Sequence, residues 1–251
     1  MKNAPNVENF KVSLVIPAYN EEKYIGECLD YAIESAGNKF YEIIVIDNAS
    51  TDNTRAIAEK RSGVDGARVR VVREDNKGLT RARQRGFIEA KGDILAYIDA
   101  DTHMPAGWYD TIVREFSKND NLACLSGPYI YYGVSKIKTF SVKLYYWIAK
   151  PIYLVVGYMA TGGNFAIRKT VLEKMGGFDT TIVFYGEDID IARRASKFGK
   201  VKFKNNFVMY TSPRRLDGQG FFNTAWVYVI NFFSEVLRHR PTNNADYKDI
   251  R

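Results

Sequence analysis

The chain has 251 residues, of which 46% are apolar, 14% aromatic and 26% charged. This composition excludes disordered, collagen-like and low-complexity proteins, and the length suffices for one sizeable α/β domain. The most apolar stretches, 144–160 and 221–237, are interrupted by polar side chains, so no membrane-spanning helix is expected. The N-terminal residues lack the apolar core of a signal peptide, which predicts a cytoplasmic location. Cys28 and Cys124 form no metal or disulfide pattern and are expected to be buried thiols.

Positive charge is concentrated in the last quarter of the chain. The formal net charge is +7, and residues 193–251 contain 12 Lys and Arg against 4 Asp and Glu. Such a basic region favours a phosphate-bearing ligand, a polyanion or an anionic membrane surface, although a solvated lysine-rich face has the same composition. No base-stacking motif is interleaved with this charge, so a nucleic-acid partner is not expected.

Short apolar runs and helical patterns alternate through the first 100 residues. An apolar run predicts a buried parallel strand, and apolar residues at intervals of three and four predict a helix packed on one side. We expect strands at 12–16, 42–46, 69–72 and 94–98, and helices at 21–35, 53–60 and 79–90. Strands separated by helices of this length indicate right-handed crossovers and a mostly parallel sheet.

Polar and acidic residues follow the predicted strands at one edge of this sheet. In open α/β sheets, the ligand lies beyond the carboxyl ends of the strands. The residues at those ends are 17–21, 47–48 and 99–101. We therefore expect a polar, acidic ligand site at this edge.

Asp99 and Asp101 are separated by one residue at the end of an apolar strand. Two carboxylates held this close repel each other unless a cation lies beside them, and their oxygens suit Mg²⁺ or Mn²⁺. A strand-terminal Asp-x-Asp therefore favours a divalent cation that bridges to a diphosphate. The alternative interpretation is an Asx turn or a helix cap before Pro105.

A second acidic group, Glu187 and Asp188, follows Gly186. A carboxylate presented to an acceptor hydroxyl can take its proton and act as a general base. The alternative is the start of a helix, where carboxylates interact favourably with the helix dipole.

Seven short segments carry a further signal. They are VIPAYNEE at 15–22, VIDNASTD at 45–52, GLTRAR at 78–83, YIDAD at 97–101, TGGNFAIR at 161–168, GGFD at 176–179 and GED at 186–188. In this order and spacing they resemble the family 2 inverting glycosyltransferases, over roughly residues 11–215. The resemblance implies the GT-A fold, an α/β fold with a Rossmann-like, mostly parallel central sheet flanked by helices and, here, a C-terminal helical extension.

The resemblance also implies a role for each matched position. The nucleotide-binding positions are Pro17, Ala18, Tyr19, Glu21, Asp47 (for the base), Gly78, Arg83, Asp99 and Ala100. Gly162, Gly163 and Asn164 are expected to border the donor sugar and the acceptor. Asp101, together with Asp99, is expected to hold Mn²⁺ or Mg²⁺. Asp188 matches the family's general base, and Glu187 beside it is the second catalytic position, expected to bind the acceptor or the donor sugar.

The implied reaction is a single displacement. Asp188 deprotonates a hydroxyl of a saccharide or lipid-linked acceptor, which displaces the nucleoside diphosphate and inverts the anomeric carbon. The cation at Asp101 offsets the charge that develops on the diphosphate. A UDP-sugar is the favoured donor, and cell-envelope polysaccharide biosynthesis is the expected setting.

Some positions depart from the family's pattern. Gln84 replaces the Asn that usually follows the arginine, and Asn48 replaces a second acid after Asp47. The late histidine of the family is absent; Arg214 and Arg215 occupy that region and are expected to clamp the diphosphate, because guanidinium groups suit phosphate oxygens. His103 is expected to begin a loop rather than to bind the metal.

We expect a GT-A domain at 1–220, with a nucleotide-sugar half at about 11–120 and an acceptor half at about 121–220. An amphipathic helix and tail are expected at 221–251, because apolar residues at helical spacing are followed by Arg238 and Arg240. This helix is expected to pack in the core or in a homodimer. The alternative is peripheral contact of 221–240 with the inner face of the cell membrane.

Two other functions are compatible with the same fold. The first is transfer to a polyprenyl phosphate at the membrane surface, where the acceptor is already ionised and Asp188 is dispensable. The second is a catalytically silent nucleotide-binding scaffold. The presence of both acidic pairs, Asp99 with Asp101 and Glu187 with Asp188, argues against a silent protein.

Overall fold

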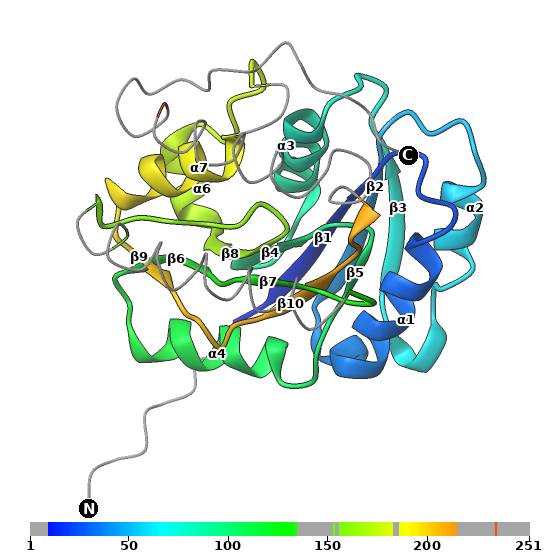
Figure 1. Cartoon of the computed structure of the whole chain (residues 1–251), viewed down its shortest axis with the longest axis horizontal. Coiled ribbons are helices and arrows are strands. Elements are labelled where there is room, and N and C mark those ends of the chain that lie inside the picture. The colour runs from blue at the N-terminus through cyan, green and yellow to red at the C-terminus, as the bar shows by residue number, and fades with distance from the viewer. Residues whose placement is uncertain (1–9, 135–152, 154–155, 183–185, 215–233, 235–251) are drawn as a thin grey trace, which may run out of the picture.

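Figure 1 shows a computed structural model of the chain, which describes residues 10–134, 153, 156–182, 186–214 and 234. Apart from Ser234, the helix and tail expected at 221–251 lie outside the described residues, and so does Arg215. Within the described part of the chain, no helix is both long enough and apolar enough to cross a membrane.

The predicted alternation of strands and helices is confirmed in the first half of the chain. The described strands are β1 (Val12–Ala18), β2 (Glu42–Asp47), β3 (Val69–Arg73), β4 (Ile94–Ile98), β5 (Thr102–His103), β6 (Leu122–Ser126), β7 (Tyr129–Tyr131), β8 (Asn164–Arg168), β9 (Lys200–Phe203) and β10 (Met209–Thr211). The described helices are α1 (Ile25–Ala36), α2 (Thr54–Glu59), α3 (Leu79–Glu89), α4 (Trp108–Lys118), α6 (Lys169–Met175) and α7 (Glu187–Ser196), with short 3₁₀ turns at Gly37–Lys39 and Val64–Gly66.

The first helix begins four residues later than predicted. The carbonyl of Glu21 accepts hydrogen bonds from the N–H groups of Tyr24 and Ile25, so residues 21–24 form a turn ahead of α1. The N–H of Glu21 donates a hydrogen bond to the Thr54 hydroxyl oxygen at 2.7 Å. These contacts fix the Glu21 backbone near the carboxyl end of β1.

A seven-stranded sheet forms the centre of the molecule, in the order β3-β2-β1-β4-β8-β6-β9. Its pairs are parallel except those that β8 makes with β4 and β6, which are antiparallel. The mostly parallel sheet is therefore confirmed, with one reversed strand. A second, three-stranded sheet has the order β5-β10-β7 and lies in front of the main sheet in Figure 1.

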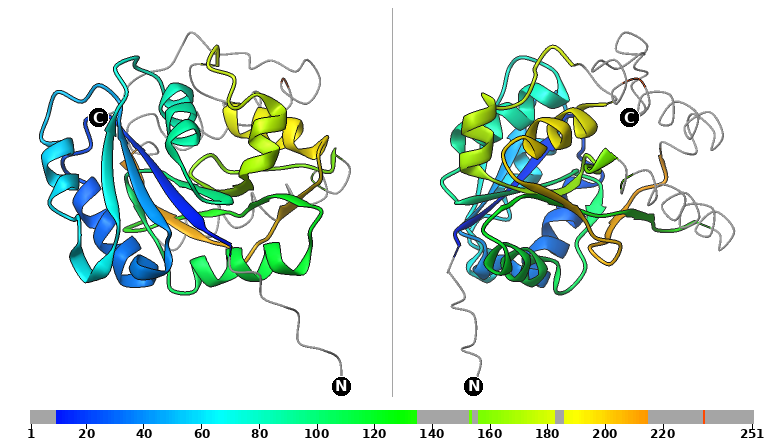
Figure 2. Two further views of the ribbon diagram at one scale, coloured as in Figure 1. Left: turned by 180° about the vertical axis from the view of Figure 1, so that it is seen from behind. Right: turned by 90° about the vertical axis from the view of Figure 1, so that its left-hand side faces the viewer.

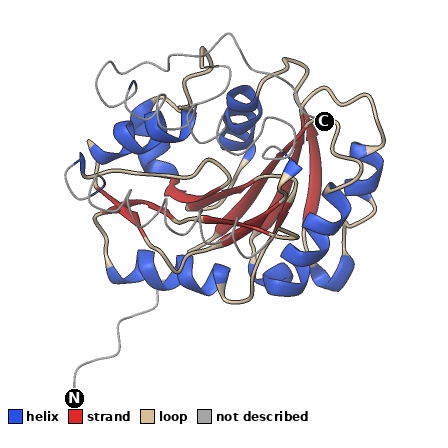
Figure 3. Cartoon of the chain, viewed as in Figure 1, coloured by secondary structure: helices blue, strands red, loops and turns tan. Residues whose placement is uncertain are grey.

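Helices cover both faces of the main sheet, as the views in Figure 2 and the colouring in Figure 3 show. Side chains along each strand alternate between the two faces, so Leu14 and Ile16 pack with α1, α2 and α4. The intervening Val15 packs with α3, α6 and α7 on the other face. Both faces are thus buried, which explains the unbroken apolar runs in the sequence.

The pairing of β4 with β8 joins the two halves of the chain at the expected ligand edge. Ile98, the last residue of β4, lies opposite Asn164, the first residue of β8. Antiparallel pairing brings the residues that follow β4 next to those that precede β8. Asp99 and the Gly162-Gly163 pair therefore meet, although they are far apart in the sequence.

Candidate active site

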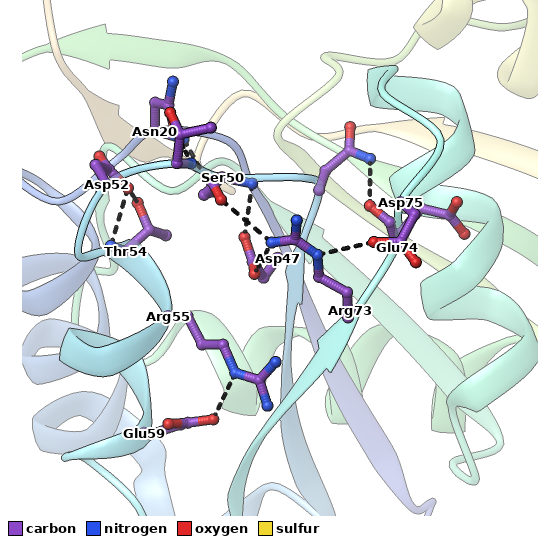
Figure 4. Close-up of polar contacts among 12 residues, drawn as sticks. Asn20, Asp47, Ser50, Asp52, Thr54, Arg55, Glu59, Arg73, Glu74 and Asp75 are labelled. Atoms are coloured by element: carbon purple, nitrogen blue, oxygen red, sulfur yellow. Dashed lines mark hydrogen bonds and ion pairs between the residues drawn. The ribbon is translucent and has the colours of Figure 1, made fainter.

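Asp47 and Arg73 form an ion pair at the carboxyl ends of β2 and β3. The Asp47 carboxylate is buried and accepts a hydrogen bond from Arg73 Nη1 at 2.7 Å, and the two side chains point toward each other in Figure 4. Arg73 also donates to Asp75 at 3.0 Å, and Asp47 accepts the N–H of Ser50 at 3.1 Å. Arg73 is a further site residue that the motifs did not indicate.

Asn48 ties the ends of β1 and β2 to the loop before α3. Its N–H donates to the Ala18 carbonyl at 2.8 Å, and its side-chain amide donates to the Asn76 carbonyl at 2.8 Å. Its Oδ1 accepts the N–H of Gly78 at 2.7 Å. An aspartate could not donate to a carbonyl, so the departure from the family's pattern has a structural reason.

Gly78 has φ 149°, a conformation that side chains disfavour, so glycine suits this loop. Tyr19 follows the end of β1, and the ammonium of Lys77 lies 3.8 Å from the centroid of its ring. Pro17 and Ala18 are buried within β1 itself. Of these predicted nucleotide positions, Tyr19 is the one with a partly exposed side chain next to the Gly78 loop.

The Asp99 carboxylate is held at both oxygens. Arg83 Nη2 lies 3.3 Å from Oδ1, and the Tyr129 hydroxyl donates to Oδ2 at 2.7 Å. Burial, and then the charge of Asp99, raise the pKa of Tyr129 well above its ordinary value, so the hydroxyl stays protonated and remains a donor. Asp99 is thereby fixed in orientation while 35% of its side chain stays exposed.

Gly162 and Gly163 make room for this arrangement. A Cβ atom at Gly163 would collide with the Tyr129 hydroxyl and the Asp99 carboxylate, and one at Gly162 would lie 2.9 Å from Oε1 of Glu187. The two glycines therefore border the acidic group, and their contact with the donor sugar stays a prediction.

Arg83 joins the two acidic pairs. Its fully buried side chain comes from α3, and Nη1 lies 3.1 Å from Glu187 Oε1 while Nη2 contacts Asp99. Opposing carboxylates offset the cost of burying a guanidinium group. The prediction that Arg83 holds the acidic end of the site agrees with these contacts.

Asp188 is the second residue of α7, next to Glu187. Burial, and then the charge of Glu187, raise its pKa to about 7, against the lowering effect of Arg83. A carboxyl group with a pKa near neutrality can exchange a proton with a substrate close to physiological pH. The Asp188 side chain is partly exposed, so a ligand can reach it.

Asp101 and Glu21 converge on one guanidinium group. Arg214 donates to both Glu21 oxygens at 2.6 and 2.7 Å, and its Nε lies 2.8 Å from Asp101 Oδ2. Burial lowers the pKa of Arg214, but the hydrogen bonds to Glu21 and the charges of Asp101 and Glu21 outweigh this and raise it.

These two carboxylates fit a divalent cation. They already stabilise a positive charge at this place, and their hard oxygen atoms are the ligands that Mg²⁺ and Mn²⁺ prefer. Among the described residues, no three His, Cys, Asp or Glu side chains are grouped to hold a metal. Asp101 is the side chain best placed to hold the ion, and phosphate and water oxygens would complete its coordination. The Asp99 oxygens contact Arg83 and Tyr129, and its role as a second ligand stays a prediction.

Two predicted site residues are buried. The Asn164 side chain is completely buried, accepts from Trp108 Nε1 at 2.9 Å and donates to the Phe207 carbonyl at 2.7 Å. Ala100 is buried in the core cluster beneath α1 and α4. Their contacts with the sugar and the nucleotide stay predictions.

Gln84 and His103 also have defined partners. Gln84 Oε1 accepts the N–H of Phe178 at 2.8 Å, which links α3 to the loop after α6. His103 lies in the short strand β5, not in a loop, and its ring stacks between Tyr31 at 4.2 Å and Tyr132 at 4.0 Å.

Tyr129 and Arg73 are the site residues that sequence reasoning missed. Tyr129 begins an aromatic-rich stretch, and Arg73 ends an ordinary strand pattern. Neither belongs to a recognisable motif, so the sequence offered no signal that separates them from structural residues.

Comparisons with known proteins agree with this fold. The glycosyl transferase family 2 model matches residues 13–176, more than half of the chain. Among solved structures, a mannosyltransferase from Pyrobaculum calidifontis, in complex with GDP-Man and Mn²⁺, is similar with a TM-score of 0.70 and 21% identity, over 96% of this chain and 68% of that one. Glucosyl-3-phosphoglycerate synthase from Mycobacterium tuberculosis, in complex with Mn²⁺ and UDP, is similar with a TM-score of 0.64 and 21% identity, over 93% and 82%.

Curated relatives match a shorter part of the chain. Dolichol-phosphate mannosyltransferase of Pyrococcus furiosus is 32% identical over 65% of this chain and 47% of its own length. Glycosyltransferase GlyG of Streptococcus pneumoniae is 31% identical over 48% of this chain and 40% of its own. The chain thus spans less than half the length of these relatives.

The fold is therefore that of the GT-A glycosyltransferases. Within this class, the chain belongs to glycosyl transferase family 2, as the seven sequence segments predicted.

Proposed function

We propose that the chain is an inverting glycosyltransferase that moves a sugar from a nucleotide-diphosphate sugar to an acceptor hydroxyl. The observation that carries this proposal is the continuous set of contacts from Tyr129 through Asp99 and Arg83 to Glu187. Asp188, whose pKa is raised to about 7, follows Glu187 in α7, and this supports its role as the base.

Asp188 is the proposed general base. In its ionised form it takes the proton of the acceptor hydroxyl, whose oxygen then bonds to the anomeric carbon as the bond to the diphosphate breaks. One displacement of this kind inverts the anomeric configuration. Arg83 and Glu187 position Asp188 and tune its pKa.

Asp101 is the proposed ligand of Mn²⁺ or Mg²⁺, which would offset the negative charge on the leaving diphosphate. Arg214 is the proposed second cation for the diphosphate, because its side chain already lies beside Asp101. Asp99, fixed by Tyr129 and Arg83, is proposed to accept a hydroxyl of the donor. Arg215 retains its predicted role as a second clamp.

The donor base is proposed to bind at Asp47 and Arg73. A carboxylate accepts a ring N–H and a guanidinium group donates to a carbonyl, so the pair complements a base in which these two groups are neighbours. Uracil, thymine and guanine have that pattern, whereas cytosine and adenine do not. A UDP-sugar remains the favoured donor, and GDP and dTDP are the alternatives.

Titration calorimetry with UDP, GDP and dTDP, each with and without Mn²⁺, tests the proposal. We expect one diphosphate to bind with a strong dependence on the metal, and Asp101→Asn to weaken that binding by about a hundredfold, as expected when a charged partner is lost. Asp110→Asn is the matched control, because Asp110 is exposed and pairs only with surface Lys39 in the described contacts.

The absence of binding to all three nucleotides would overturn the proposal. Equal binding with and without Mn²⁺, unaffected by Asp101→Asn, would remove the metal site while leaving the nucleotide site. The donor that binds identifies the nucleotide-sugars to be used in transfer assays.

A second candidate is transfer to a polyprenyl phosphate at a membrane surface. The similarity to dolichol-phosphate mannosyltransferase favours it. A phosphate acceptor is already ionised, so in this case Asp188 would be dispensable. Membrane contact through 221–240 and a homodimer remain predictions, since those residues lie outside the described part of the chain.

A further inference from the structure

We propose that Arg214 couples metal binding to nucleotide binding, because its guanidinium group competes with a divalent cation for Asp101 until the diphosphate arrives. This inference rests on the proposed function, in which Asp101 holds the cation. The inference also assigns an order of binding to the divalent cation and the nucleoside diphosphate.

Asp101 and Glu21 concentrate negative charge beside Arg214. The Asp101 and Glu21 side chains are 10% and 5% exposed, and Arg214 contacts both. Two buried carboxylates close together repel each other, so positive charge beside them is favoured. A divalent ion on Asp101, however, would lie next to the guanidinium group and be repelled by it.

The guanidinium group of Arg214 divides its contacts between two carboxylates. Nη1 and Nη2 form a two-pronged contact with Glu21, and Nε alone faces Asp101. The guanidinium carbon also lies 4.8 Å from the centroid of the Tyr24 ring. Arg214 can therefore release Asp101 by breaking one contact while Glu21 and Tyr24 still hold the side chain.

Backbone contacts keep Arg214 close to Asp101. Thr211 of β10 pairs with Thr102 of β5, and the N–H of Ser212 donates to the Asp101 carbonyl at 3.1 Å. The N–H of Arg214 donates to the Ser212 hydroxyl at 3.3 Å. Because the competitor is tethered, its effective concentration at Asp101 is high whatever the protein concentration.

These contacts predict effects of opposite sign for metal and nucleotide. Without a diphosphate, Arg214 weakens the binding of a cation to Asp101. With a diphosphate present, the guanidinium group gains an anionic partner and no longer needs Asp101, so it strengthens nucleotide binding. Linkage requires that metal and nucleotide then increase each other's affinity by the same factor.

The test measures Mn²⁺ alone, and then UDP or GDP at saturating Mn²⁺, by titration calorimetry on the full chain. For Arg214→Gln we expect Mn²⁺ alone to bind about tenfold more tightly and the nucleotide about tenfold more weakly, the factors for one charge-assisted hydrogen bond. A purely structural role of Arg214 would weaken both. Arg55→Gln is the matched control, because Arg55 forms an exposed pair with Glu59 on α2.

Arg214→Gln removes a guanidinium group that contacts two buried carboxylates, so it can impair folding. The double variant Glu21→Gln with Arg214→Gln removes one of these charges and carries the same expectation for Mn²⁺. Unchanged or weaker Mn²⁺ binding in a folded variant would overturn the inference.

Asp101→Asn separates the two levels of the proposal. If it abolishes Mn²⁺ binding while Arg214→Gln has no effect, the coupling inference fails and the metal site stands. If Asp101→Asn leaves Mn²⁺ binding unchanged, the metal site at Asp101 and the coupling inference fail together.

Discussion

At the scale of single residues, the chemistry of the proposed site depends on the protonation of Asp188. Its pKa of about 7 reflects burial first and the adjacent Glu187 charge second. The ionised form of Asp188 therefore becomes populated only as the pH rises through neutrality. Ionisation destabilises the folded state, but the proposed reaction requires it.

We predict that transfer activity rises with pH to about 7 and is level above it, because the acceptor proton requires ionised Asp188. Asp188→Asn is expected to lower kcat by about a hundredfold or more, the usual contribution of a general base. The measurement is a pH–rate profile of kcat/KM for wild type and variant. Retention of most of the activity in Asp188→Asn would instead favour the polyprenyl phosphate acceptor.

Thermal unfolding provides the control for that variant. The folded pKa lies above the ordinary aspartate value, so the cost of ionising Asp188 is absent at low pH, grows between about 4 and 7 and is complete above 7. Asp188→Asn is therefore expected to raise the melting temperature at pH 8 and to have little effect near pH 4. A lower melting temperature at pH 8 would contradict this account of the pKa.

At the scale of elements, Arg83 connects α3, the end of β4 and the start of α7. Its side chain is 2% exposed and contacts Asp99 and Glu187. Helix α3 thus supplies the guanidinium group of Arg83, whereas the carboxylates that it contacts come from other elements. The free-energy cost of burying this guanidinium group is offset by its pairing with the carboxylates of Asp99 and Glu187.

We predict that Arg83→Met lowers the free energy of unfolding by about 3 kcal/mol or more, because it removes the guanidinium group that pairs with the buried Glu187 carboxylate. Arg85→Met, two residues along the same helix, removes only the partly exposed pair with Glu89 and should cost less than about 1 kcal/mol. Urea unfolding of both variants measures the difference. Equal losses of unfolding free energy in the two variants would show that the buried ion pairs of Arg83 contribute little to stability.

At the scale of the whole molecule, the site exists because the second half of the chain inserts a reversed strand into the sheet of the first half. Strand β8 lies between β4 and β6 and brings Gly163 against Asp99 and Tyr129. Each half supplies only part of the acidic group, so neither contains the proposed site alone.

We predict that Gly163→Ala weakens binding of the donor nucleotide-sugar by about tenfold or more, because the new methyl group displaces the hydrogen bond between Tyr129 and Asp99. Tyr129→Phe should have a similar effect without the steric change. If both act through this bond, the double variant is no worse than Gly163→Ala, which a double-mutant cycle of donor affinity measures. Additive losses would contradict a shared cause.

The sequence was sufficient to predict β1 to β4, α1 to α3 and the acidic pairs. Apolar runs, helical periodicity and polar residues at strand ends are local signals, and each depends on neighbouring residues only. The contacts that link these elements were not predictable in the same way. Arg214 and Glu21 are 193 positions apart, and their meeting depends on the pairing of β10 with β5.

The tertiary structure also decided the roles of individual residues. Asn164 belongs to a glycine-rich motif that favoured a ligand contact, yet the packing of Trp108 and Phe207 places its amide in the core. Tyr129 belongs to no motif and reaches Asp99 through the placement of β7. Local periodicity encodes which elements form, whereas strand order and register decide which distant side chains meet, and burial among those partners sets their charge and their chemistry.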